Sequence, residues 1–129
     1  MTEETFLPGD PTWVGSDSPT SAFSAVFEDD GDTGYFYAVE RRADGELEIL
    51  DAVHIYNVRN VVDREVPSVA RVIWSADGLK AALLINNYAH AVLDFAARRG
   101  YCRTNFPPPG GAWRAAARVP WSDALLGLF

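Results

Sequence analysis

The sequence predicts a mainly β domain, in which a single twisted antiparallel sheet or a partly closed barrel of about six strands is followed by a short C-terminal helix. Two observations lead to this prediction. Residues 22–56 alternate between apolar and polar side chains and are interrupted by glycine-containing turns, and a period of two is typical of half-buried strands. Residues 69–97 contain three further strand-like runs joined by two tight turns, which predicts hairpins joined as a meander.

The first strands follow from this alternation. Residues 22–28 place three apolar side chains on one face, and residues 35–40 are rich in aromatic residues of high β-propensity. A turn that ends at Gly45 leads into a long strand over residues 47–56. Residues 58–66 have valines at helix-like spacing before a proline, so we expect a short helical turn or an irregular crossover there.

The second half of the chain continues the pattern. Strands are predicted over residues 69–74, 81–85 and 88–97, with turns at Asp77-Gly78 and Asn86-Asn87, because glycine and asparagine tolerate a positive φ. The middle run is apolar on both faces, as expected of a central strand. After a proline-rich loop, residues 121–129 resemble one or two helical turns capped by a serine, with leucines directed toward the sheet.

Length and composition favour one domain. The chain has 129 residues, 48% of them hydrophobic, which is enough to form a core without disulfides or metal. We expect residues 22–129 to form this domain and residues 1–21 to form a tail or an edge segment docked by Trp13. A single cysteine, an acidic start without a signal-peptide pattern and short apolar runs favour a cytoplasmic protein that does not enter a membrane.

Charge is distributed unevenly along the chain. Residues 1–65 hold 15 of the 18 acidic residues and only four arginines, a net charge of -11, whereas residues 66–129 have a net charge of +4. An acidic half and a single lysine, Lys80, argue against nucleic-acid binding and for a basic protein partner or for solubility.

Candidate catalytic residues are few. His90 and Asp94 lie four residues apart on one predicted strand, a separation of roughly 13 Å, so they do not form a dyad by themselves. Cys102 lies among arginines that would favour its thiolate. Together with His54 or His90 it supplies the residue types of a thiol hydrolase, although a buried cysteine and hydrogen-bonded histidines are the commoner explanation.

No cofactor or metal is expected. The acidic turn Asp29, Asp30 and Asp32 does not match a calcium loop of the EF-hand type, because Gly34 and Tyr35 stand where the fifth and sixth loop positions require other residues. One cysteine and two widely spaced histidines match no zinc site. A soluble acidic hairpin turn explains the aspartates, and they are candidates for binding a basic partner.

Arginines and aromatic residues alternate near the C-terminus. Because binding hot spots are rich in arginine and aromatic residues, the candidate binding residues here are Arg98, Arg99, Tyr101, Arg103 and Trp113. The same residues would serve equally well to close the end of the sheet by stacking guanidinium groups on rings. The sequence leaves both interpretations open.

Four segments resemble a small family of uncharacterised bacterial proteins, domain of unknown function 2251: VFEDDGDTGYFYA, HIYNV, WSADGLKAA and DFAARRGYCRTNFP. The resemblance covers residues 22–129. It implies membership of a family without an assigned activity, so it transfers no catalytic residue, cofactor or partner.

The sequence therefore favours a non-catalytic protein-binding module. By analogy with other small acidic bacterial proteins, it would be an immunity or inhibitor protein that presents an acidic face. The alternative is a small-ligand-binding protein or a thiol-dependent enzyme around Cys102, His54 and His90. Self-association through an exposed strand edge is a further possibility.

Overall fold

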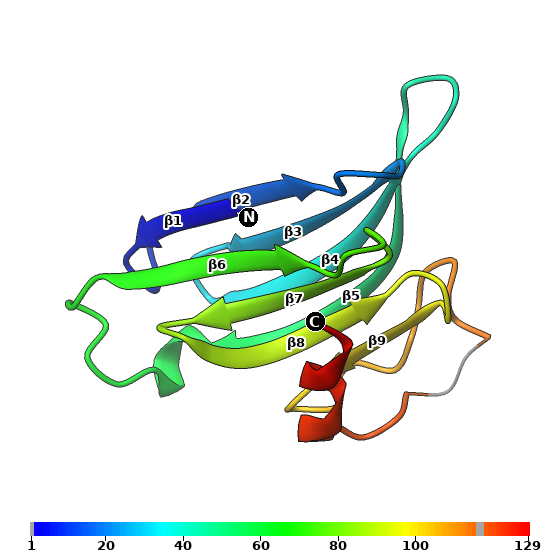
Figure 1. The fold of residues 1–129 in the computed structure, drawn as a ribbon. Helices are drawn as coiled ribbons and strands as arrows, with labels where there is room; N and C mark the ends of the chain where they lie inside the picture. Colours follow the sequence, from blue (N-terminus) through cyan, green and yellow to red (C-terminus); the bar gives the residue numbers. More distant parts are fainter. Residues whose placement is uncertain (1, 116–117) are drawn as a thin grey trace.

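Two antiparallel sheets packed face to face form the molecule (Figure 1). The computed structural model describes residues 2–115 and 118–129. Within these residues one sheet has the strand order β1-β6-β7-β8-β9 and the other the order β2-β3-β4-β5. We call them sheet A and sheet B. Their strands are β1 (Thr2–Phe6), β2 (Thr12–Asp17), β3 (Phe23–Asp29), β4 (Thr33–Arg41), β5 (Leu47–Asn57), β6 (Ser68–Trp74), β7 (Lys80–Ile85), β8 (Tyr88–Asp94) and β9 (Arg99–Cys102).

The predicted fold class is confirmed: the protein is mainly β and its strands pair antiparallel. The sequence predicted one sheet, but the strands divide between two. Alternation shows that a strand is half buried, and it does not show which sheet the strand joins. The crossover between β5 and β6 contains a 3-10 turn, η1 (Val58–Asn60), and carries the chain from sheet B to sheet A.

The first residues of the chain form strands in both sheets. β1 pairs with β6 at one edge of sheet A, and β2 pairs with β3 at one edge of sheet B. Each sheet thus gains an edge strand from residues 2–17, the segment for which the sequence suggested a tail or a docked edge.

Turn chemistry positions the hairpins as expected. Asn86 and Asn87 have φ angles of 52° and 66° and connect β7 to β8 in a tight turn, a conformation that asparagine tolerates better than most residues. Gly78 has a φ of +69° between β6 and β7. The C-terminal turns are a 3-10 helix, η2 (Asp123–Leu128), whose N-cap Ser122 accepts a hydrogen bond from the Ala124 N–H.

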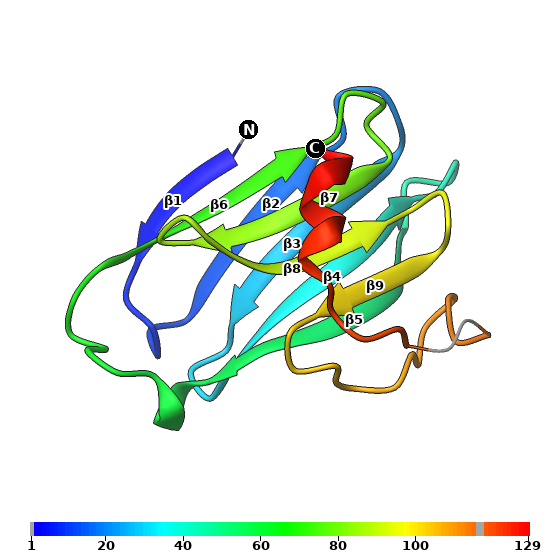
Figure 2. The same cartoon turned by 60° about the horizontal axis from the view of Figure 1, so that its bottom comes forward.

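The core fills the space between the two sheets. It contains the inward-facing residues of both sheets, among them Phe27, Phe36, Val53, Leu83 and Leu93, none of which is exposed. The 3-10 helix η2 lies outside this core, against the outer face of sheet A (Figure 2). The outer face of sheet B carries no comparable helix among the described residues (Figures 1 and 2).

Candidate binding surface

The acidic turn between β3 and β4 is partly a structural element. Asp29 is 1% exposed, and its carboxylate accepts hydrogen bonds from the Gly9 and Gly31 N–H groups and from the Tyr56 hydroxyl. Burial, and secondly the hydrogen bond to Asp29, raise the pKa of Tyr56, so this hydroxyl remains a donor. A carboxylate with three internal donors stabilises the turn and is not free to bind a partner.

Two of the three predicted aspartates do reach the surface. Asp30 is exposed and accepts hydrogen bonds from the backbone N–H groups of Asp32 and Thr33. These backbone bonds, Thr33 first, lower the pKa of Asp30. Asp32 is also exposed. The turn therefore presents two carboxylates to solvent instead of three.

Cys102 and His54 lie on either side of one hydroxyl. The Cys102 Sγ and the Thr104 Oγ1 are 3.4 Å apart, and the same oxygen lies 3.2 Å from the His54 Nδ1. The His54 Nε2 lies 3.0 Å from the Asn57 Oδ1. Cys102 is fully buried, opposite Ala91 of β8. A substrate cannot reach this thiol without opening the core, so the arrangement supports a hydrogen-bonded packing role for both residues.

His90 lies on β8 and makes an edge-to-face contact with the Tyr88 ring, at 5.2 Å between ring centres. Burial, and secondly the nearby Arg103 charge, lower the pKa of His90 to about 4. Asp94, four residues further along, accepts a hydrogen bond from the Ala97 N–H. Among the described residues no hydrogen bond or ion pair joins His90 to Cys102 or Asp94. The structure thus brings Cys102 close to His54, through Thr104, but links neither Cys102 nor Asp94 to the His90 side chain.

The lowered pKa of His90 predicts a pH-dependent stability. An unfolded histidine binds a proton below about pH 6.5, whereas His90 in the folded protein resists protonation down to about pH 4. The folded state should therefore lose stability as the pH falls from 6.5 to 4, by at most about 1.4 kcal/mol per pH unit. Urea unfolding at pH 7.5 and 4.5 measures this loss, which should be smaller in the variant His90→Gln. An equal loss in both proteins would contradict the assignment.

The arginine and aromatic residues near the C-terminus mostly close the sandwich. Trp113 is 4% exposed and packs edge-on against Phe95, so it belongs to the core and not to a surface. Arg118 forms an ion pair with Asp51 of β5, with 2.7 Å between Nη1 and Oδ2. Its other guanidinium N–H groups donate to the Gly100 and Pro107 carbonyl oxygens.

The remaining members of this group differ in exposure. Arg98 is exposed and adopts a φ of 56°, while Arg99 and Tyr101 are partly buried along β9. Arg103 lies between the rings of Tyr88 and Trp121, 4.2 and 4.7 Å from their centres. For Trp113 and Arg118 the closing interpretation therefore describes the contacts, whereas Arg103 is exposed and contacts the C-terminal segment outside the core.

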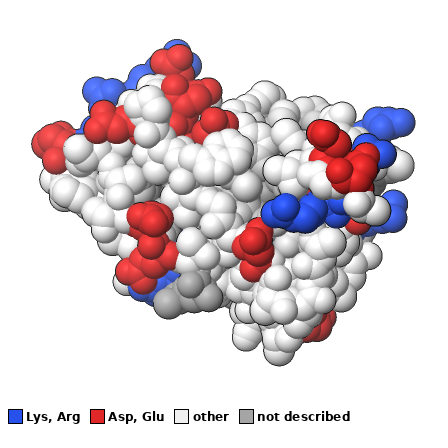
Figure 3. Space-filling model, turned by 90° about the horizontal axis from the view of Figure 1, so that it is seen from above, with Lys and Arg blue, Asp and Glu red and all other residues white. Residues whose placement is uncertain are grey.

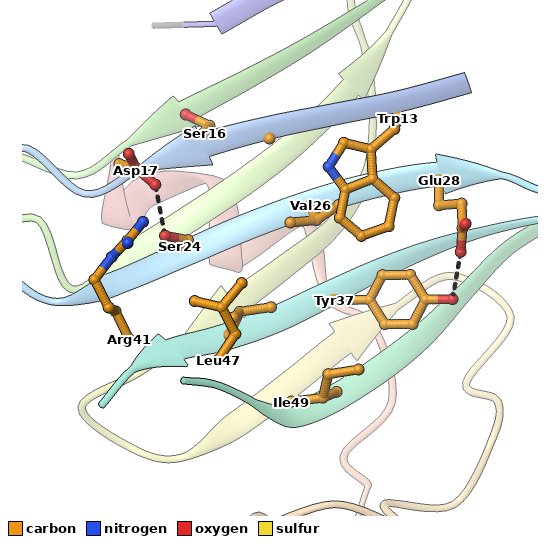
Figure 4. A pocket seen from close by; sticks show the side chains of 12 residues that line it. Trp13, Ser16, Asp17, Ser24, Val26, Glu28, Tyr37, Arg41, Leu47 and Ile49 are labelled. Carbon is orange, nitrogen blue, oxygen red and sulfur yellow. Dashed lines mark hydrogen bonds between the residues drawn. The ribbon is translucent and has the colours of Figure 1, made fainter. Parts of the chain in front are cut away.

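The sequence did not identify an exposed apolar surface on the outer face of sheet B. Trp13, Leu47 and Ile49 are 64%, 59% and 55% exposed there. They border a concavity of about 420 Å3 whose floor includes Val26 and Tyr37 (Figure 4). We call these five residues the sheet B patch. The sequence does contain a relevant pattern, because Leu47 and Ile49 alternate with inward-facing residues of β5. Whether their outward-facing side chains are exposed depends, however, on what covers this face of the sheet.

Polar groups lie at both ends of the patch. At one end the Tyr37 hydroxyl donates to the Glu28 Oε1 at 3.0 Å, and at the other the Ser24 hydroxyl donates to the Asp17 Oδ1 at 2.7 Å, near Arg41 (Figure 4). Burial, and secondly the bond to Glu28, raise the pKa of Tyr37 to about 12, so it stays a neutral donor. The patch is thus an apolar surface with charged ends.

A space-filling view from the side of β1 and β2 shows how the charged side chains are distributed on that side of the molecule (Figure 3). Charged side chains form separate groups on the two sides of this view and near its middle, with uncharged surface between the groups (Figure 3). Within residues 2–115 and 118–129 no three metal-ligating side chains come together. In the same part of the chain no helix is long and apolar enough to cross a membrane.

Comparison with known proteins places the chain in a family. A family model described as "Uncharacterized protein conserved in bacteria (DUF2251)" matches residues 6–129. The chain belongs to the DUF2251 family. An uncharacterized protein of Haemophilus influenzae (strain Rd) is 41% identical over 110 residues, which cover 84% of this chain and 67% of the relative. No solved structure matches the chain. The family predicted from the four sequence segments is confirmed, and the match extends it to the segment that contains β2.

Proposed function

We propose that this DUF2251 protein is a non-catalytic binding module and that it binds a basic protein partner through the sheet B patch. The observation that carries the proposal is the exposure of Trp13, Leu47 and Ile49 on one uncovered sheet face. Soluble proteins seldom leave large apolar side chains together on a surface unless a partner covers them. Tryptophan and tyrosine are also the residues that most often dominate binding energy at interfaces.

Charge supports a basic partner. Strands β2 to β5 lie entirely within residues 1–65, the part of the chain with a net charge of -11. Glu28 and Asp17 border the patch itself, and the exposed Asp30 and Asp32 lie in the turn next to it. Complementary charge around an apolar centre speeds association and excludes acidic competitors. An immunity or inhibitor protein that acts in the cytoplasm is the cellular role that we propose for such a module.

The test compares two variants that change charge equally. Ile49→Lys introduces a cation into the sheet B patch, and Val62→Lys introduces one at a residue of the β5–β6 crossover that is 82% exposed. Tagged wild-type and variant proteins are used to capture partners from the native host, and a partner held by the wild type is purified for calorimetry. We expect Val62→Lys to bind like the wild type and Ile49→Lys to bind at least about tenfold more weakly.

Trp13→Ala provides the second measurement. Truncation of a central interface tryptophan commonly costs about 2 kcal/mol or more, which corresponds to roughly thirtyfold in Kd. Binding should also weaken as salt rises, because the opposing charges are screened. Unchanged Kd values for both Trp13→Ala and Ile49→Lys would overturn the proposal, as would capture that does not differ between Ile49→Lys and Val62→Lys. If light scattering shows that the wild type is a dimer and that Ile49→Lys is a monomer, the sheet B patch binds a second copy of this chain and not a basic partner.

A further inference from the structure

A second concavity lies on the opposite side of the molecule and is lined by residues of η2 and of the outer face of sheet A. Figure 2 shows η2 lying over this face. The volume of the concavity is about 510 Å3, within the range of small-molecule sites. We call it the C-terminal groove. Its walls are mostly apolar and come from the sheet, through Ile73, Ala82, Leu84 and Ala89, and from η2 and its C-cap, through Leu126 and Phe129.

One cation lies in this apolar setting. Arg103 lines the groove, donates from Nε to the Ala89 carbonyl oxygen, and is held between the Tyr88 and Trp121 rings. Two rings and a carbonyl fix the plane of its guanidinium group. Because a planar guanidinium presents paired donors that match a carboxylate, a fixed arginine in an apolar groove is suited to an anion with an apolar body.

A carboxylate of the chain itself already lies beside Arg103 and accepts a hydrogen bond from the Trp121 Nε1–H at 2.9 Å. The Asp123 carboxylate lies 3.5 Å from the Arg103 Nη2, although Asp123 is 79% exposed. Residues three apart align along a 3-10 helix, so Asp123, Leu126 and Phe129 face the groove together. Leu126 and Phe129 remain 42% and 38% exposed. An exposed ion pair of this kind contributes little to stability. A ligand carboxylate that binds Arg103 more tightly can therefore displace the Asp123 carboxylate.

We propose that the C-terminal groove binds small amphipathic carboxylates. The ligand carboxylate takes the place of Asp123 on Arg103, and the apolar part lies between η2 and β7–β8. A small molecule fits these observations better than a protein segment, because the groove retains its volume with η2 in place. The site is separate from the sheet B patch and does not depend on it.

Decanoate is the probe, and calorimetry with the full-length protein is the measurement. We expect saturable binding by the wild type, and binding at least about tenfold weaker for decanol, which lacks the carboxylate. Arg103→Gln should weaken decanoate binding at least about tenfold, because charge-assisted hydrogen bonds are lost. Arg114→Gln, a change at an exposed arginine outside the groove, should have no effect. Asp123→Asn removes the competing carboxylate and should tighten binding about two- to fivefold.

Folding of each variant is checked by circular dichroism. If Arg103→Gln does not fold, Arg103→Lys replaces it; this variant keeps the charge but loses the paired donors, and it should still weaken binding. Equal affinity of the wild type and the Arg103 variant, or of decanoate and decanol, would overturn the proposal. So would an unchanged affinity for Asp123→Asn. If a synthetic peptide of residues 121–129 binds and decanoate does not bind saturably, the proposal is wrong and the groove binds a protein segment.

Discussion

Replacement of Arg118 with alanine is expected to lower the free energy of unfolding by about 3–5 kcal/mol. Arg118 and Asp51 have side chains that are 6% and 1% exposed, and two N–H···O bonds of 2.7 and 3.1 Å join them. Without the guanidinium group, the Asp51 carboxylate would remain buried without its cation. The Gly100 and Pro107 carbonyl oxygens would lose a donor as well. Urea unfolding followed by tryptophan fluorescence measures the change.

Arg114→Ala is the matched control for this experiment. Arg114 is exposed, and exposed substitutions of this kind usually change stability by no more than about 0.5 kcal/mol. The double variant Asp51→Leu with Arg118→Met should recover part of the loss, because a buried pair is often replaceable by apolar residues of similar size. If Arg118→Ala costs no more than Arg114→Ala, the ion pair does not hold the sandwich closed.

Trp113→Ala should cost a comparable amount, about 3–5 kcal/mol. Its ring is 4% exposed and packs edge-on against Phe95, with 5.4 Å between ring centres. Its backbone N–H donates to the Leu50 carbonyl oxygen of β5, which attaches the loop after β9 to sheet B. Removal of the ring leaves a cavity in the core beside Phe95. The denaturant concentration at the midpoint of unfolding should therefore fall.

A comparison of Trp13→Ala with Trp113→Ala distinguishes the effect of losing an exposed tryptophan from the effect of losing a buried one. Trp13 is 64% exposed, so its truncation should change stability by less than about 0.5 kcal/mol while it weakens partner binding. Trp113→Ala should show the opposite result. Its stability should fall strongly, while the molecules that remain folded should bind the partner as the wild type does. Equal stability losses in the two variants would contradict the assignment of Trp113 to the core and of Trp13 to the surface.

Much of the fold was predictable because strands and tight turns are local. The alternation around Phe27, the apolar run that became β7 and the asparagine pair Asn86-Asn87 each predicted the element that the structure contains. Ser122 was likewise predicted as a cap, although its helix is of the 3-10 type. The number of sheets was not predictable, since sheet membership depends on pairing between distant segments such as β1 and β6.

The candidate sites were less predictable for the same reason. The sequence left open whether Trp113 and Arg103 form a binding surface or close the sheet, and the structure separates them: Trp113 is in the core, whereas Arg103 is exposed and lies 4.7 Å from the centre of the Trp121 ring. Asp29 looked like a surface charge, but its carboxylate accepts hydrogen bonds from the nearby Gly31 N–H and from Gly9 and Tyr56, which are 20 and 27 positions away in the sequence. Trp13, the largest exposed residue of the sheet B patch, was expected only to dock a tail.

The sequence by itself determined that this chain is a mainly antiparallel β protein of the DUF2251 family with an acidic first half. These properties depend on composition, on a period of two and on residues a few positions apart. Only the tertiary structure decided which faces are covered, because burial of a side chain depends on segments far away in the chain. It buried Cys102 and Asp29, paired Arg118 with Asp51, and left one apolar face of sheet B open to solvent.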